Sequence, residues 1–236
     1  MIQTLGLTRR QDDGRLRPDH ISFKVSPGQV YCMLGTPRSG KTTIINLLVG
    51  LVKPTAGRAL INNVDCEVSA LEARRHLTHI PSNLQFSADL TPHQNLTYFA
   101  ALGGKRDLED REIRMVMREV KIPDRAFALR TRQLPHEICQ RLGVALAMLK
   151  QTPVLLADEP TLGFDAQSTR DFVELLPLLK ERGVAVLFCT RDPFLAGQIA
   201  DVVGLLKEGV LILESTRDQF RAEPIDQLYR KYLIQL

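Results

Sequence analysis

The chain has 236 residues, of which 44% are hydrophobic and 25% charged, proportions typical of an ordinary globular protein rather than a disordered one. Its net charge of +4 is small. Because Lys and Arg alternate with acidic residues instead of forming a basic stripe, the composition does not predict nucleic-acid binding. We expect one domain over residues 1–236, with a core that needs neither disulfides nor a metal.

Taken in chain order, the first clear element is a short apolar run, Val30–Leu34, which stops at Gly35 and is followed by helical periodicity from Thr42 to Leu51. Between Leu90 and Lys150 we find no convincing strand and expect an inserted helical subdomain at approximately residues 83–150. Its amphipathic stretches are Asn95–Leu102, Leu108–Val120 and Ile138–Leu149.

Short apolar runs return in the second half of the chain, at Pro153–Ala157 and Val184–Phe188. Their Val and Leu content, with helical periodicity nearby, predicts strands of a mainly parallel sheet covered by helices on both faces. The segment 202–213 resembles a β-hairpin, and Ile225–Leu236 a closing amphipathic helix. The fold class predicted is α/β.

Neither the start of the chain nor any apolar run indicates a membrane segment. Met1–Gly6 lacks the charged start and apolar core of a signal peptide, and no apolar run approaches the roughly 18 residues that cross a bilayer. The four cysteines form no C-x-x-C pair, which favours reduced thiols. We therefore expect a cytoplasmic location, with any membrane role supplied by a partner.

A phosphate-binding loop follows the first strand. The pattern G-x-x-x-x-G-K-[ST] is matched by Gly35, Thr36, Pro37, Arg38, Ser39, Gly40, Lys41 and Thr42, with Thr43 next in the helix. Glycines let backbone N–H groups turn toward phosphates, and the helix presents its positive end to the same anions. We expect this loop to bind ATP, with Lys41 reaching the β- and γ-phosphates and the Thr42 hydroxyl binding Mg²⁺.

Two acidic residues directly follow the strand predicted at Pro153–Ala157. Asp158 would be delivered to the carboxyl edge of the sheet, where open α/β folds bind ligands. It is the candidate to complete the Mg²⁺ shell, and its neighbour Glu159 is the candidate catalytic residue that polarises the attacking water.

The residues that follow carry a family resemblance. Asp158-Glu159-Pro160-Thr161, then Gly163-Phe164-Asp165, resembles the D-E-P-T-x-G-L-D stretch of ATP-binding cassette (ABC) ATPases. Further matches fall in family order over nearly the whole chain: Pro27-Gly28, Lys53–Gly57, Asp89–Thr91, Asn95-Leu96 and Gln140–Leu142.

The resemblance implies a P-loop NTPase fold with an N-terminal antiparallel β portion. It also implies partners, namely an integral membrane permease and a second ATPase subunit, in a homodimer or a heterodimer, at the cytoplasmic face of the membrane. The stretch from Leu90-Thr91 to Ala100 is similar to the export ATPases that pair with separate six-helix permeases.

Several positions depart from the family pattern. The signature L-S-G-G-Q, which closes on the partner's ATP, aligns with Leu134–Ile138, where Glu137 introduces a negative charge. The family glutamine of the metal and water position aligns with Ser82, and the histidine that contacts the γ-phosphate aligns with Arg191, which we expect to act as a donor fork in catalysis. The adenine-stacking aromatic aligns with Gln11.

Two functions stay open on this basis: a transport ATPase with altered hydrolysis, and a nucleotide-responsive regulatory subunit with negligible turnover. A third, a soluble ABC protein acting in DNA repair or translation, is disfavoured because the chain has no coiled-coil insert, second cassette or basic patch.

Overall fold

The computed structural model describes residues 1–234, and its first layer is a small antiparallel sheet. The sheet has the order β2-β1-β4-β5, with β1 at Ile2–Thr8, β2 at Ile21–Val25, β4 at Ala56–Ile61 and β5 at Val64–Asp65. The register of β1 shifts between Thr4 and Leu7, around Gly6 with its φ of +56°. This bulge interrupts the in-out alternation of β1, which therefore buries both Leu7 and Thr8.

The second sheet has six strands in the order β10-β9-β3-β8-β7-β6. Its members are β3 (Val30–Gly35), β6 (Leu77–Ile80), β7 (Val154–Asp158), β8 (Ala185–Thr190), β9 (Val202–Lys207) and β10 (Val210–Thr216). All neighbouring pairs are parallel except the β9–β10 hairpin. The α/β class with its antiparallel N-terminal portion is confirmed, as are the two predicted strands and the hairpin in the second half of the chain.

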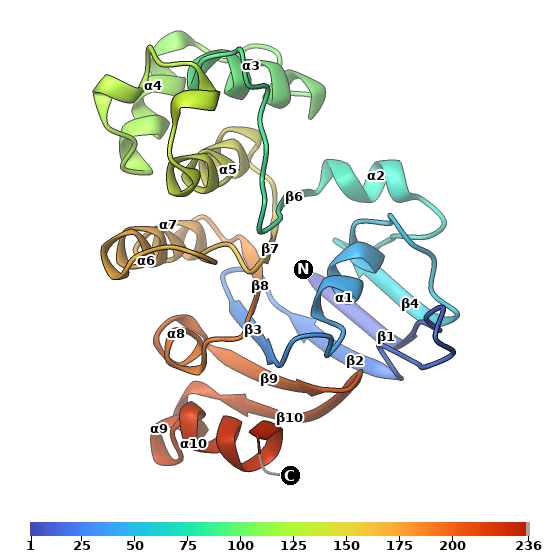
Figure 1. The fold of residues 1–236 in the computed structure, drawn as a ribbon. Helices are drawn as coiled ribbons and strands as arrows, with labels where there is room; N and C mark the ends of the chain where they lie inside the picture. Colours follow the sequence, from blue (N-terminus) through green and yellow to red (C-terminus); the bar gives the residue numbers. More distant parts are fainter. Residues whose placement is uncertain (235–236) are drawn as a thin grey trace.

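The helices fall into three groups (Figure 1). Near the first sheet lie α1 (Lys41–Leu48) and α2 (Ala70–Arg75). Between β6 and β7 in the chain come α3 (Pro92–Leu102), α4 (Asp110–Glu119), the 3₁₀ turns Asp124–Ala126 and Thr131–Gln133, and α5 (His136–Lys150). The remainder are α6 (Ala166–Val173), α7 (Leu175–Glu181), α8 (Pro193–Ile199), α9 (Arg217–Ala222) and α10 (Ile225–Tyr229), with a π-helical turn at Arg230–Ile234. Within residues 1–234, no helix combines the length and the apolar character of a membrane span.

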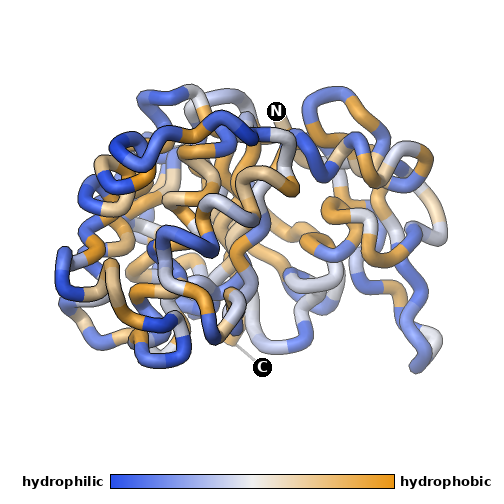
Figure 2. The backbone as a smooth tube through the Cα atoms, turned by 90° about the horizontal axis from the view of Figure 1, so that it is seen from above, coloured by the Kyte–Doolittle hydropathy of each residue, from blue (hydrophilic) through white to orange (hydrophobic). Residues whose placement is uncertain are grey.

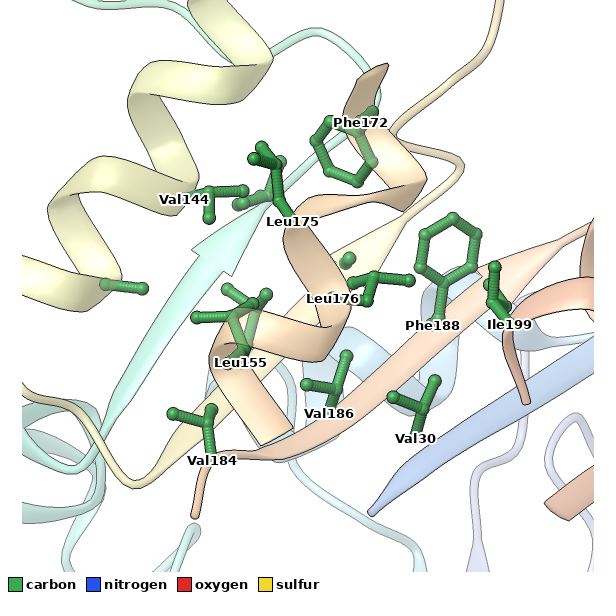
Figure 3. Packing of buried hydrophobic residues seen from close by; sticks show 14 of the residues in the cluster. Val30, Val144, Leu155, Phe172, Leu175, Leu176, Val184, Val186, Phe188 and Ile199 are labelled. Carbon is green, nitrogen blue, oxygen red and sulfur yellow. The ribbon is translucent and has the colours of Figure 1, made fainter. Parts of the chain in front are cut away.

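The larger sheet is the centre of the core, with hydrophobic segments concentrated inside and hydrophilic ones along the outline (Figure 2). Phe172 and Leu176 from α6 and α7 lie over Phe188 of β8 (Figure 3), and all three side chains are buried. The central strands β3, β7 and β8 are buried along their whole length, because helices or the first sheet cover both faces. Because these strands are held on both faces, the residues at their carboxyl ends lie at fixed positions.

Candidate nucleotide-binding site

The site begins where β3 turns into α1 (Figure 1). Gly35 ends the strand, and a Cβ at this position would lie 2.6 Å from the Leu206 carbonyl oxygen and 2.6 Å from Ser39 Oγ, so only glycine fits. Gly40, with a φ of +111°, caps α1 in a conformation that L side chains rarely adopt. The two glycines therefore shape the tight turn from β3 into α1.

Lys41 points back over this loop. Its Nζ donates to the Gly35 carbonyl at 2.6 Å and to the Thr36 carbonyl at 3.1 Å, and it lies 3.6 Å from Glu159 Oε1. The side chain is only 6% exposed. The ammonium is thus fixed in the loop centre with its charge only partly neutralised, as a phosphate-binding lysine requires.

Glu159 follows β7 with a φ of +48°, an uncommon left-handed conformation that costs about 1 kcal/mol for a residue with a side chain. Its amide still donates to the Cys189 carbonyl at 2.9 Å, so the residue remains attached to the sheet. The carboxylate accepts from the Arg191 amide at 3.2 Å and lies 3.2 Å from Arg191 Nε. The sheet edge brings Lys41, Glu159 and Arg191 together.

Burial raises the pKa of Glu159 above its ordinary value, with Asp158 adding to the rise, and Lys41 and Arg191 oppose it. A carboxylate with a raised pKa is a stronger base than an exposed one, and this favours a role in polarising water.

Asp158 is the last residue of β7 and is 7% exposed. Among the described residues, neither its Oδ1 nor Ser39 Oγ has a hydrogen-bond partner, although both atoms are buried. A buried carboxylate oxygen without a partner is suited to Mg²⁺, directly or through water, because this cation prefers oxygen ligands. Thr42 is exposed and lines the pocket in front of the loop, so its hydroxyl oxygen would be a second ligand of Mg²⁺.

The pocket in front of the loop has a volume of about 380 Å³. Its lining consists of Gln11, Arg17, Pro37, Arg38, Ser39, Gly40, Lys41, Thr42, Thr43, Glu159 and Arg191. Ser82 is not among these residues, and its carbonyl accepts a hydrogen bond from Gln140 Nε2 at 3.1 Å. Sequence reasoning missed Arg17, because no local pattern connects it with a loop more than 15 residues away.

The segment aligned with the family signature lies at the start of α5. Pro135 is the N-cap of the helix, directly before its first residue, His136. Glu137 is in the first turn, where the helix dipole stabilises a negative charge. The His136 ring stands edge to face with Phe164 at 5.8 Å, and Gln140 Nε2 donates to the Pro81 carbonyl at 2.9 Å. These contacts connect the start of α5 with the segments after β6 and β7.

Comparisons with known proteins agree with the family resemblance of the sequence. The family model for ABC transporters matches residues 18–162, more than half of the chain. The chain is 32% identical over 229 residues to the probable multidrug ABC transporter ATP-binding protein YbhF of Escherichia coli (strain K12), covering 94% of this chain but only 38% of that protein. It is 31% identical over 238 residues to the bacitracin transport ATP-binding protein BcrA of Bacillus licheniformis, covering 99% of this chain and 74% of that protein. A solved ATP-binding subunit of an ABC transporter has the same fold, with a TM-score of 0.84 at 22% identity over 98% of both chains.

Proposed function

Because the chain belongs to the ABC transporter family, we propose that it is an ATP-binding subunit that couples ATP binding and hydrolysis to a membrane permease. The observation that carries the proposal is the meeting of Lys41, Glu159 and Arg191 in one pocket beside the loop. A chance glycine turn would not place two cations and a carboxylate of raised pKa around the same space.

Each residue has a distinct task in the proposed reaction. Lys41 exchanges its bonds to the loop carbonyls for the β- and γ-phosphate oxygens of ATP. Glu159 orients and polarises the attacking water, and Arg191 stabilises negative charge on the γ-phosphate as a planar donor. When bound, Mg²⁺ neutralises phosphate charge, and Thr42 and Asp158 would hold it, with Ser82 contributing through a water.

The partners and the direction of transport belong to the proposal as well. YbhF and BcrA are named for multidrug and bacitracin transport, which supports membership of the export group. We assign residues 83–150 as the helical subdomain that docks on a permease at the cytoplasmic face of the membrane. A second ATPase subunit would close on the loop, as a copy of this chain or as a different cassette.

Two substitutions test the proposal in the complex with the permease. Lys41→Ala should abolish measurable ATP binding, whereas Lys53→Ala, an exposed lysine outside the pocket, should leave binding unchanged. Glu159→Gln should reduce ATP turnover to background while ATP still binds. Equal turnover in wild type and Glu159→Gln would contradict the assigned role of this carboxylate.

A second candidate function, the regulatory subunit, is favoured by the contacts of Arg191. Arg191 cannot exchange a proton, and its 3.2 Å contact with Glu159 competes with the water that this carboxylate would polarise. A regulatory subunit would bind ATP through Lys41 with background turnover in the full complex. Robust hydrolysis there would exclude it.

Restoring the signature segment distinguishes a homodimer, in which this segment would limit ATP turnover, from a heterodimer. If the carboxylate of Glu137 faced a partner's γ-phosphate at about 4 Å, the repulsion would be about 4 kcal/mol at an effective dielectric near 20. Restoring L-S-G-G-Q through Pro135→Ser, His136→Gly, Glu137→Gly and Ile138→Gln should then raise turnover. Unchanged turnover would show that this segment does not limit the reaction, as in a heterodimer whose partner supplies the working signature.

A further inference from the structure

The phosphate loop carries an arginine in an unfavourable conformation. Arg38 has a φ of +65°, in the left-handed region that residues with a side chain rarely adopt. Its side chain is exposed and lines both the pocket that would hold ATP and a second pocket beside the loop. Two acidic residues share that second pocket, but Asp13 pairs with Arg17 at 3.2 Å, and Glu208 makes no ion pair within residues 1–234. In that range the guanidinium of Arg38 has no counterion, so no contact within the chain explains the strain.

A second charge without a counterion lies at the start of α5. Glu137 is half-buried in the first turn of this helix, and its carboxylate makes no hydrogen bond or ion pair in the described part of the chain. The cation one turn further along the helix, Arg141, is engaged elsewhere. Its Nη1 donates to the Lys121 carbonyl at 2.8 Å and lies 3.9 Å from Asp171 Oδ2. The helix dipole therefore stabilises the charge of Glu137, but no side chain neutralises it.

Both charges belong to the carboxyl edge of the larger sheet. Arg38 lies in the loop after β3, and the contact of His136 with Phe164 holds the start of α5 against the segment after β7. Exposed apolar side chains follow two strand ends of the same edge. Leu162 after β7 is 48% exposed, and Phe194 after β8 is 65% exposed. Apolar side chains and charges without counterions on one edge favour its burial against another protein.

We propose that the second subunit is a copy of this chain, and that Arg38 forms an ion pair with the partner's Glu137 beside the bound nucleotide. The proposal rests on the proposed function, in which a second subunit closes on the phosphate loop. In a two-fold dimer, a contact between position 38 and the partner's position 137 occurs twice. The chain carries opposite charges at these two positions, which favours a copy of itself over a different cassette.

The ion pair changes the effect of Glu137 on closure of the dimer. An unpaired carboxylate beside the γ-phosphate would repel it, as calculated above. A guanidinium is a planar donor with five N–H groups, so Arg38 can contact the partner's Glu137 and a phosphate oxygen together. With Arg38 between the two anions, Glu137 strengthens the contact between the subunits instead of opposing it.

The experiment measures dimerisation of the full chain by analytical ultracentrifugation in ATP and Mg²⁺, with the Glu159→Gln variant as the parent because it keeps ATP bound. Arg38→Glu and Glu137→Arg should each raise the dissociation constant of the dimer about a hundredfold, since two repulsive contacts replace two ion pairs. An equimolar mixture of these two variants should dimerise as the parent does, because each chain then meets the opposite charge on its partner. Glu112→Arg, an exposed glutamate in the first turn of α4, is the matched control and should leave dimerisation unchanged.

A cross-linking experiment tests the proximity of the two positions independently of their charge. Arg38→Cys and Glu137→Cys are made in separate chains, mixed in ATP and Mg²⁺, and treated with a short bis-maleimide. The four native cysteines are buried and should not react. A cross-linked dimer should form in the mixture and in neither variant alone, because a residue away from the two-fold axis does not meet its own copy.

Calorimetry with ATP on every variant separates this proposal from the proposed function. Reversals that leave the dimer unchanged, or a mixture of ATP-binding reversal variants that stays monomeric, would overturn the ion pair. If Arg38→Glu itself fails to bind ATP, the cross-link decides, and its absence in the mixture would overturn the proposal. A parent chain that binds ATP but stays monomeric would indicate a different cassette as the partner, which overturns the proposal and leaves the proposed function intact. A parent chain that binds no ATP would remove the proposed function itself.

Discussion

Replacing Glu159 with glutamine should stabilise the fold at neutral pH. Glutamine keeps the shape of the side chain and removes the charge that burial disfavours. Because the pKa of Glu159 is raised above its ordinary value of 4.5, the folded protein holds this proton more tightly than the unfolded chain does. Ionising the group therefore lowers stability as the pH rises from 4.5 through the folded-state pKa, and the loss is complete above that value. The Glu159→Gln variant does not lose this stability, because glutamine does not ionise.

The size of the gain follows from opposing contributions around the carboxylate. Lys41 at 3.6 Å attracts it by about 5 kcal/mol at an effective dielectric near 20. Arg191 is 41% exposed, so solvent screening limits its net contribution to about 1 kcal/mol. Desolvation costs several kcal/mol per buried ion, and repulsion from Asp158 adds to it. Burial is the largest influence on the pKa of Glu159 and raises it, so the unfavourable contributions exceed the attractions by a small margin, and we expect a gain on the order of 1 kcal/mol.

Thermal unfolding measured from pH 8 down to pH 4 tests the reasoning. At pH 7.5 the variant should melt about 2–4 °C above the wild type, the shift that about 1 kcal/mol produces in a chain of this size. The difference should disappear as the pH falls toward 4.5. Glu67→Gln, an exposed carboxylate outside the pocket, should show no such difference at any pH. A wild type more stable than Glu159→Gln at pH 7.5 would refute the argument, because the ion pairs would then outweigh burial.

Two further substitutions probe the loop and the helices between β6 and β7. Gly35→Ala places a Cβ 2.6 Å from Ser39 Oγ and from a backbone oxygen, so it should lower the free energy of unfolding by about 1–3 kcal/mol and abolish ATP binding, measured by urea denaturation and calorimetry. Unaltered ATP affinity would contradict the tight loop. Asn95→Ala removes a fully buried amide that accepts from the Ser87 amide at 2.9 Å and donates to Thr131 Oγ1 at 2.8 Å. We expect a loss of about 2–4 kcal/mol in urea denaturation, and a loss below about 0.5 kcal/mol would show that the network is dispensable.

The features predictable from sequence are those encoded within a short window. The phosphate loop is fixed by residue types over eight positions, and the strands β7 and β8 are continuous apolar runs of the length that a doubly covered strand requires. The first sheet is harder to locate, because the bulge around Gly6 breaks the alternation in β1 that would identify a strand.

The contacts between distant segments could not be predicted from one sequence. Arg17 lies beside both Gly40 and the turn at Gly209 between β9 and β10, and no spacing along the chain encodes that approach. The left-handed backbone of Glu159 is imposed by its surroundings, since a glutamate has no intrinsic preference for it. The pocket wall and the orientation of its carboxylate are therefore tertiary properties.

The strand order also determines when the site can form during protein synthesis. The phosphate loop belongs to the first fifth of the chain, but its strand β3 pairs with β8 on one side and β9 on the other, and Ser39 is bonded to the turn at Gly209. A nascent chain that has passed the loop still lacks β8, β9 and the turn at Gly209, and it gains the last of them only when residue 209 has left the ribosome. Nucleotide can therefore stabilise the site only in a chain that extends past residue 209, so ATP binding would act after both halves of the larger sheet have been synthesised.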